Sequence, residues 1–153
     1  MSKTLGLLMP EKTTGWSGKG DIMKIIEYKD KYLEEVKDLL VELEEYILSI
    51  DEDNLEQLHP EYRDKMAILD LEGVNDNNGK CYLAIDGNMA VGLIMGYVRS
   101  YDKYDYLDYK CPKCGEVSEL VVSKNVRSKG IGSALMELSL IHISEPTRQA
   151  EIS

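Results

Sequence analysis

The sequence is short of basic residues, and this shortage excludes one class of partner. Its 153 residues hold 18 Lys and Arg against 28 Asp and Glu, a formal net charge of -10. We expect no nucleic-acid partner, because binding of phosphates needs clustered cations. Small cationic partners such as amines suit this charge.

Long apolar runs and cysteines are also scarce. No apolar run reaches the roughly 18–20 residues that cross a bilayer, and the start lacks the apolar core of a secretory signal, so no membrane partner is expected. The three cysteines, Cys81, Cys111 and Cys114, are unlike a secreted disulfide framework. These features favour a cytoplasmic protein with reduced thiols.

The two ends of the chain differ from its middle. Residues 138–148 can be back-translated into codons that resemble a transposase-type sequencing adaptor, so we expect residues 138–153 to be a non-native tail. Residues 1–22 lack hydrophobic periodicity and are rich in glycine, and either a non-native or a natural flexible leader fits them. One folded domain is expected over residues 23–137.

Hydrophobic patterns predict an α/β (α+β) chain in the order β-α-α-β-β-β-α. The first helix carries an apolar stripe from Leu33 to Ile50 opposite an acidic face, and Asp30 is expected to cap it. The second, shorter helix follows Pro60 and contains Tyr62, Met66 and Leu69; residues 75–79 form a turn cluster. The predicted strands are 24–28, 81–85, 91–98 and 116–122, and the first and last predicted helices are 32–50 and 130–137.

A loop with two closely spaced glycines, Gly130 and Gly132, joins the last predicted strand to the last helix. Backbone N–H groups beside the positive end of a helix dipole make such a loop an anion cradle, and glycine lets a pyrophosphate approach closely. A Walker loop would need Gly-Lys-Ser/Thr, and a dinucleotide fingerprint would need a small residue in place of Leu135. Both of these motifs fit poorly.

The pattern Arg127-x-x-Gly130-x-Gly132 after the strand that ends at Val122 resembles the acetyl-CoA signature of the GNAT superfamily of N-acetyltransferases. The predicted element order also matches the first seven elements of that family. The resemblance covers residues 23–137 and implies a GNAT-like acyl-CoA N-acyltransferase fold, a mixed sheet flanked by helices. The fifth strand and the rest of the C-terminal part are then missing, so the fragment itself could be inactive.

The resemblance implies direct transfer of an acetyl group from acetyl-CoA, as co-substrate, to a primary amine in a ternary complex, without a metal. Backbone groups of the fourth strand would bind the pantetheine arm and stabilise the oxyanion. Backbone N–H groups of the loop would hold the pyrophosphate, and Ser133 would add a hydroxyl. The implied cofactor-binding residues are Leu120, Val121, Val122, Arg127, Ser128, Lys129, Gly130, Ile131, Gly132 and Ser133.

Two acidic residues are candidates for the base that takes a proton from the amine. Glu116 is the first, because several family members place a base where the fourth strand begins, and strand alternation puts it on the face of Ser118. Glu119 is the second. A useful base at neutral pH needs its pKa raised by partial burial. A merely structural or solvated role is an equal alternative for either residue.

Two further patterns lie between the third and fourth predicted strands. Cys111-Pro112-Lys113-Cys114-Gly115 has the shape of a zinc knuckle, but only Cys81 and His59 remain as further donors for a four-ligand site, so we expect a plain hairpin turn and no metal. Phenylalanine is absent, and tyrosines crowd residues 99–115 among aspartates, a combination that suits a cationic amine or an exposed hairpin.

Three functions therefore stay open. The first is an N-acetyltransferase acting on a small-molecule or peptide amine, and the second is a non-catalytic acyl-CoA-binding module. The third is a zinc-knuckle interaction module. The sequence leaves open the identity of the acceptor amine, the oligomeric state and the general acid, which in this family is commonly a tyrosine in the missing region.

Overall fold

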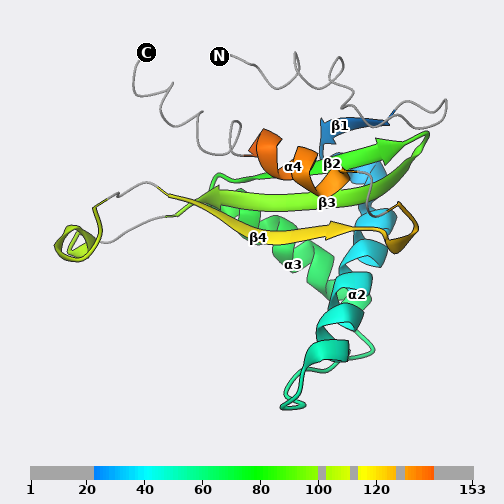
Figure 1. Cartoon of the computed structure of the whole chain (residues 1–153), viewed down its shortest axis with the longest axis horizontal. Helices are drawn as coiled ribbons and strands as arrows, with labels where there is room; N and C mark the ends of the chain where they lie inside the picture. Colours follow the sequence, from blue (N-terminus) through cyan, green and yellow to red (C-terminus); the bar gives the residue numbers. More distant parts are fainter. Residues whose placement is uncertain (1–22, 100–102, 111–113, 127–129, 140–153) are drawn as a thin grey trace.

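Four strands form one sheet, with helices on both of its faces (Figure 1). The structure is a computed structural model that describes residues 23–99, 103–110, 114–126 and 130–139. Its elements follow the expected order and are β1 (Met23–Glu27), α2 (Leu33–Ile50), α3 (Tyr62–Asp76), β2 (Lys80–Asp86), β3 (Met89–Val98), β4 (Gly115–Val122) and α4 (Ile131–Ser139). None of the described helices is both long and apolar enough to cross a membrane.

The sheet has the order β1-β2-β3-β4, and each neighbouring pair is antiparallel. A two-residue turn joins β2 to β3, and Gly87 adopts a φ of 66° there, a conformation that costs glycine little. The strand β4 pairs with β3 on one side, and no other described strand pairs with its free edge. β4 is therefore an edge strand of the described sheet.

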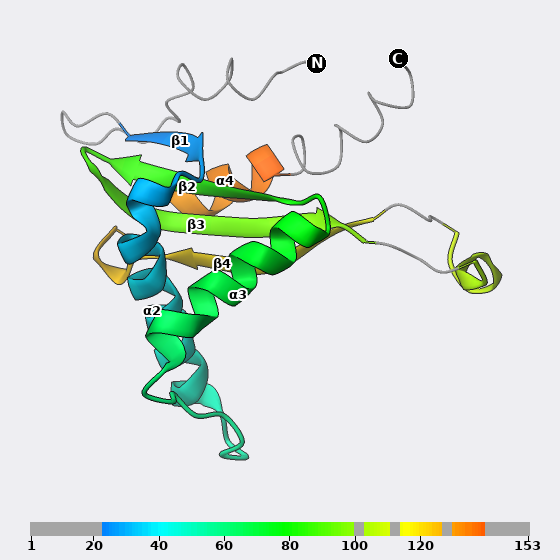
Figure 2. The same cartoon turned by 180° about the vertical axis from the view of Figure 1, so that it is seen from behind.

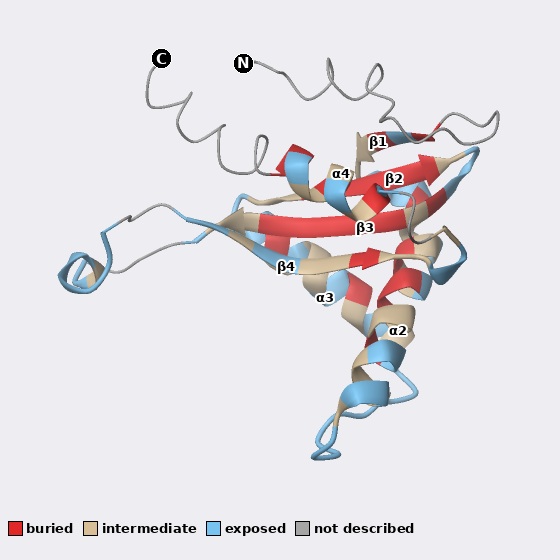
Figure 3. Ribbon diagram, viewed as in Figure 1, coloured by how far each residue is buried: buried red, intermediate tan, exposed pale blue. Residues whose placement is uncertain are grey.

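Each face of the sheet buries its own hydrophobic core. The helices α2 and α3 cover one face, which Figure 2 shows from the front, and α4 covers the other. Leu93 and Met95 of β3 belong to the core under α2 and α3, whereas Ile94 belongs to the core under α4. The central strands β2 and β3 are consequently the most buried elements (Figure 3).

The contact between β3 and α4 depends on a glycine. A Cβ atom at Gly92 would lie 3.4 Å from both Ile131 and Leu135 side-chain atoms, so the glycine lets α4 pack close to the sheet. Ile131 and Leu135 are 1% and 0% exposed and anchor the helix. Ser133, which lies between them in the sequence, is exposed on the outer side of α4.

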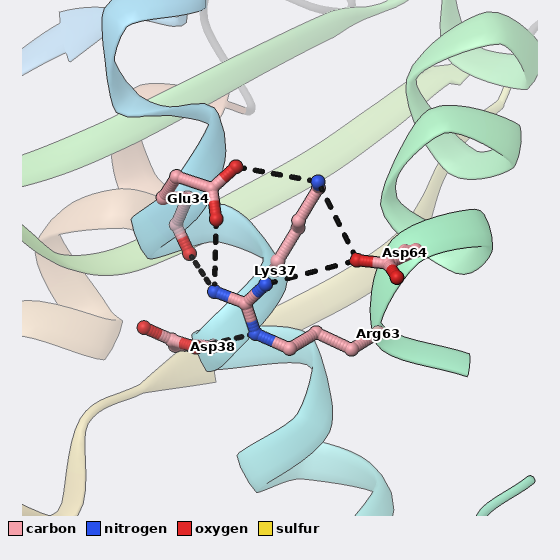
Figure 4. A network of polar contacts seen from close by, with 5 residues as sticks. All are labelled: Glu34, Lys37, Asp38, Arg63 and Asp64. Atoms are coloured by element: carbon pink, nitrogen blue, oxygen red, sulfur yellow. Dashed lines mark hydrogen bonds and ion pairs between the residues drawn. The ribbon is translucent and has the colours of Figure 1, made fainter. Parts of the chain in front are cut away.

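An ion-pair network joins α2 to α3 at the surface (Figure 4). The guanidinium of Arg63 donates to Asp38 Oδ1 at 2.9 Å and to Glu34 Oε1 at 3.1 Å. Lys37 Nζ lies 3.3 Å from Glu34 and 3.8 Å from Asp64. Because these groups are largely exposed, the network fixes the relative position of the helices more than it stabilises them.

The two N-terminal helices differ from their predicted form in detail. Ile50, expected at the end of the apolar stripe, is 57% exposed, and no side-chain hydrogen bond from Asp30 caps α2. The helix α3 is longer than expected and runs into the turn cluster; its buried residues are Ala67 and Val74, and Leu69 is 58% exposed.

The turn cluster acts as the C-terminal cap of α3. The Asn77 side chain donates to the Gly73 carbonyl at 2.8 Å, and Asn78 adopts a φ of 56°. The Gly79 N–H then donates back to the Val74 carbonyl at 2.7 Å, as in a helix that ends in a left-handed residue. The asparagines therefore stop the helix later than the sequence pattern suggested.

Candidate active site

An open groove of about 530 Å³ lies between β4 and α4. It is lined by Leu120 from β4 and by Gly132, Ser133, Met136 and Glu137 from α4. The lining combines apolar side chains with the first turn of a helix, whose N–H groups have no partner within the helix. An elongated ligand with an anionic end and an apolar arm suits such a groove.

The two glycines of the predicted anion cradle, Gly130 and Gly132, have different structural roles. Gly130 adopts a φ of 82°, which few other residues tolerate, and its carbonyl accepts the N–H of Ala134 at 3.0 Å at the start of α4. A Cβ at Gly132 would meet only Val122 Cγ2, at an ordinary 3.8 Å. The backbone conformation therefore explains Gly130, whereas internal packing leaves room for a larger residue at 132.

The loop before α4 is held from the opposite side of the sheet. The backbone N–H of Lys124 donates to Glu42 Oε1 of α2 at 2.8 Å, and the Ser123 N–H donates to the Val91 carbonyl at 2.8 Å. Of the predicted loop residues, Arg127, Ser128 and Lys129 lie outside the described residues. The described part of the loop is thus anchored to α2 and to β3.

A bulge in β4 changes which residues share a face. Glu119 pairs with Met95 and Val117 with Gly96, so that Ser118 is the additional residue, and its Oγ donates to the Met95 carbonyl at 3.3 Å. Glu116 pairs with Tyr97.

Met95 and Tyr97 are two residues apart on β3, so their side chains lie on the same face of the sheet. The side chain of a residue that pairs with either of them lies on that same face. Glu116 and Glu119 thus lie on the same face, the one covered by α2 and α3. Strict alternation along β4, which puts Glu116 with Ser118, fails at this bulge.

Glu119 lies among other acids, and Glu116 does not. Burial, the neighbouring charge of Asp70 and a hydrogen bond with that carboxyl group raise the pKa of Glu119 to about 7, and Glu44 adds to the effect. Burial also raises the pKa of Asp70. Glu116 instead accepts a hydrogen bond from Tyr97, which raises the pKa of that tyrosine. Glu119 therefore has the environment of a base that works at neutral pH.

The acids around Glu119 come from three elements, and we call them the acid cluster. Its members are Glu44 from α2, Glu56 from the α2–α3 connection, Asp70 from α3 and Glu119 itself. Glu44 is 8% exposed, and burial followed by the charge and hydrogen bond of Glu56 raises its pKa. Tyr62 borders the cluster, and burial, followed by the charges of Glu44 and Glu119, raises its pKa.

Sequence reasoning missed Glu44 and Asp70, although a signal was present. Glu44 follows Val36 and Leu40 at intervals of four, and Asp70 lies three residues after Ala67 and four before Val74. Both positions therefore belong to buried helix faces. An acidic side chain on a buried face needs a polar partner or has a function. This criterion, applied to the helix patterns, would have identified Glu44 and Asp70 as candidates.

The remaining predicted features lie apart from the groove. The segment 103–110 projects away from the sheet (Figure 1), and Tyr104, Tyr106 and Tyr109 are exposed there. Cys111 to Lys113 fall outside the described residues, Cys114 is exposed and Cys81 is buried. Over the part of the chain that the structure describes, no three His, Cys, Asp or Glu side chains are grouped so as to hold a metal ion.

Comparisons with solved structures give the same fold. A GCN5-related N-acetyltransferase from Ralstonia eutropha has a TM-score of 0.58 at 19% identity, over 82% of this chain and 78% of that chain. An aminoglycoside N-acetyltransferase in complex with CoA has a TM-score of 0.57 at 16% identity, over 81% of this chain and 70% of that chain.

One similar structure is far larger than this chain. It is a fungal multi-domain beta-N-acetylglucosaminidase with a GCN5-related glucosamine N-acetyltransferase region, and the chain covers 13% of it at 21% identity and a TM-score of 0.55. The match takes in 84% of this chain. At these identities the likeness is one of fold.

Comparisons at the level of sequence give one result. No curated protein sequence matches this chain significantly. The family description "Acetyltransferase (GNAT) family" matches residues 42–145, about two thirds of the chain. This span contains β4, the glycine loop and α4, and with the fold it confirms the resemblance read from Arg127, Gly130 and Gly132. The chain belongs to the acetyltransferase (GNAT) family.

Proposed function

We propose that this chain transfers an acetyl group from acetyl-CoA to a primary amine, which attacks the thioester directly. Membership of the family supports acyl transfer in general. The identity of the donor, acetyl-CoA, and of the acceptor, a primary amine, is the part that we propose. The observation that carries it is the groove between β4 and α4, which joins a helix N-terminus to a glycine that internal packing does not require.

The groove suits the two chemical parts of the donor. The first-turn N–H groups of α4, the open space beside Gly132 and the Ser133 hydroxyl would hold the pyrophosphate, together with Arg127, Ser128 and Lys129. Leu120 and Met136 offer apolar contacts to the pantetheine arm. Backbone groups of β4 from Leu120 to Val122, at the edge that no other described strand covers, would hydrogen-bond the amides of that arm as a further strand would.

Glu119, the second candidate in the sequence, is the base that we propose. A primary ammonium group has a pKa near ~10.4, so it must lose a proton before it attacks. Glu119 stands in the acid cluster with a pKa of about 7, close to working pH. The same cluster favours a cationic acceptor, because carboxylates attract the ammonium form. Glu116, paired with Tyr97 outside the cluster, is proposed to have no part in proton transfer.

Binding and turnover of acetyl-CoA test the proposal. We expect titration calorimetry to show binding, and thiol release to follow when a polyamine, lysine, a peptide with a free amino terminus or an aminoglycoside is added. Binding without turnover on any amine would identify a non-catalytic acyl-CoA-binding module. Absence of binding by the folded chain would refute both functions.

A matched pair of variants tests the choice of base. Glu119→Gln is expected to reduce turnover by about 10²- to 10⁴-fold, the usual contribution of a general base, while acetyl-CoA binding persists. Glu116→Gln removes one charge from the same strand and is expected to leave the pH profile of turnover unchanged. If Glu116→Gln alone changes that profile, the assignment is wrong.

A further inference from the structure

Two acids from distant parts of the chain are in hydrogen-bond contact on the face covered by α2 and α3. Asp70 belongs to α3 and Glu119 to β4, and their carboxyl groups share a hydrogen bond. Ionised carboxylates only accept hydrogen bonds, so this contact exists when the pair holds a proton. The two groups therefore titrate as a pair.

Among the residues that the structure describes, the groups that face this pair carry no positive charge. The groups that face it are Glu44 from α2, Glu56 from the α2–α3 connection and Tyr62 from α3, and the β3 residue paired with Glu119 is the apolar Met95. Asp70 Oδ2 is buried and receives no hydrogen bond. Within the described residues, the lysines and the arginine that form ion pairs do so with Glu27, Glu34, Asp38, Glu61 and Asp64.

We propose that Asp70 is a positioning residue for acetyl transfer, which orients the Glu119 carboxyl group through the hydrogen bond that the two side chains share. This inference rests on the proposed function, in which Glu119 is the base. Asp70 itself touches neither the acetyl donor nor the amine in this scheme. It acts through the hydrogen bond that it makes with Glu119.

The proton balance of the step is complete with this pair. The doubly ionised pair takes one proton from the ammonium group of the acceptor and becomes the hydrogen-bonded, singly protonated pair. The free amine attacks the thioester carbonyl carbon, the C–N bond forms and the C–S bond breaks. The nitrogen loses a second proton, which the CoA thiolate takes up directly or through water. The pair returns its own proton to solvent before the next turnover.

The first test compares the pH profile of turnover in Asp70→Asn with that of the unchanged chain. With a base whose pKa is about 7, kcat/KM at pH 6 should be roughly tenfold lower than at pH 8. In Asp70→Asn the charge and the shared proton are gone while the burial of Glu119 remains, so this ratio should shrink, to about twofold for a midpoint one pH unit lower. The same amine is used throughout, so its own titration affects both profiles equally.

Asp76→Asn is the matched control, because Asp76 is an exposed residue at the end of the same helix. It should keep the roughly tenfold ratio. A merely structural role for Asp70 would lower the Tm of Asp70→Asn without moving the pH profile, and that outcome would overturn the inference while leaving Glu119 as the base.

The second test needs neither turnover nor a variant that is active. Carboxyl carbon NMR of the unliganded chain should show Glu119 titrating near 7, and at a clearly lower pH in Asp70→Asn, where burial still holds the midpoint above its ordinary value. An ordinary midpoint in the unchanged chain would overturn the inference even if Asp70→Asn failed to fold. If the midpoints shift as expected but no amine is acetylated, the proposed function fails, and the catalytic role of Asp70 fails with it.

Discussion

Replacing Glu119 by glutamine should stabilise the fold at alkaline pH. The folded state raises the pKa of Glu119 from 4.5 to about 7, chiefly through burial and the neighbouring Asp70. Between these two values the folded state binds more protons than the unfolded chain, so stability falls as the pH rises through this window. The full cost of the ionised carboxylate is present at pH 8 and absent at pH 4.

The size of this effect follows from the pKa values. A change from 4.5 to about 7 corresponds to at most ~3.4 kcal/mol, and solvent screening of this half-buried side chain reduces the expected cost to about 1–2 kcal/mol. Glu119→Gln should therefore be more stable by about 1–2 kcal/mol at pH 8. A gain of that size raises Tm by several degrees in a domain this small.

Urea unfolding at pH 4.5 and pH 8 measures the effect directly. Glutamine resembles the protonated acid in shape, so the stability difference between Glu119→Gln and the unchanged chain should nearly vanish at pH 4.5. Glu116→Gln removes one charge from the same strand and is the control for changes in net charge. A difference that is equal at the two pH values, or a loss of stability at pH 8, would refute the reasoning.

Two further substitutions separate ligand binding from folding. Gly132→Ala should fold with an unchanged Tm, because its Cβ would meet only Val122 Cγ2 at 3.8 Å, yet weaken acetyl-CoA binding by about tenfold or more in calorimetry. Gly79→Ala should instead abolish folding, as judged by circular dichroism, because its Cβ would collide with the Gly96 carbonyl oxygen. Arg63→Ala should lower Tm by a few degrees at low salt and hardly at all in 1 M NaCl, because its partners are exposed.

Periodicity and turn residues were sufficient to predict the order of the elements. The strands from Cys81 and Val91 are continuous apolar runs between glycine- and asparagine-rich turns, and the structure places them at the centre of the sheet. The position of the glycine loop could also be predicted from the sequence, because Gly130 and Gly132 follow a strand and lie at the start of a helix. Local patterns were adequate here because each pattern has one common structural explanation.

The arrangement of the acids depends on contacts between distant segments and could not be read in the same way. The extra residue Ser118 follows from the register of β4 against β3, which the cores on both faces determine. Asp70 and Glu119 are 49 positions apart in the sequence and meet only because α3 and β4 bring their side chains to the same face of the sheet. The chain has so many acidic residues that we interpreted those on the helices as solvated, and the buried acids Glu44 and Asp70 were therefore not recognised.

A chain with a net charge of -10 should repel the anionic acetyl-CoA of the proposed function. The acid cluster and the groove lie on opposite faces of the sheet, and this arrangement reduces the repulsion. Acetyl-CoA is anionic, whereas the amine is cationic before it reacts. The groove at Gly132 lies beside α4, and Arg127 and Lys129 directly precede this helix in the sequence. The acid cluster lies on the opposite face, with α2 and α3.

A sheet and its side-chain layers separate charges by roughly 10 Å, about the distance over which salt screens exposed charges. The cluster can therefore attract an ammonium group while repelling the phosphates only weakly. In the proposed function, β4 would serve both ligands, since its backbone edge would meet the donor and its Glu119 side chain would face the acceptor. On the α4 side of this strand Leu120 and Val122 are apolar, and the acid that lines the groove, Glu137, belongs to α4 and not to β4.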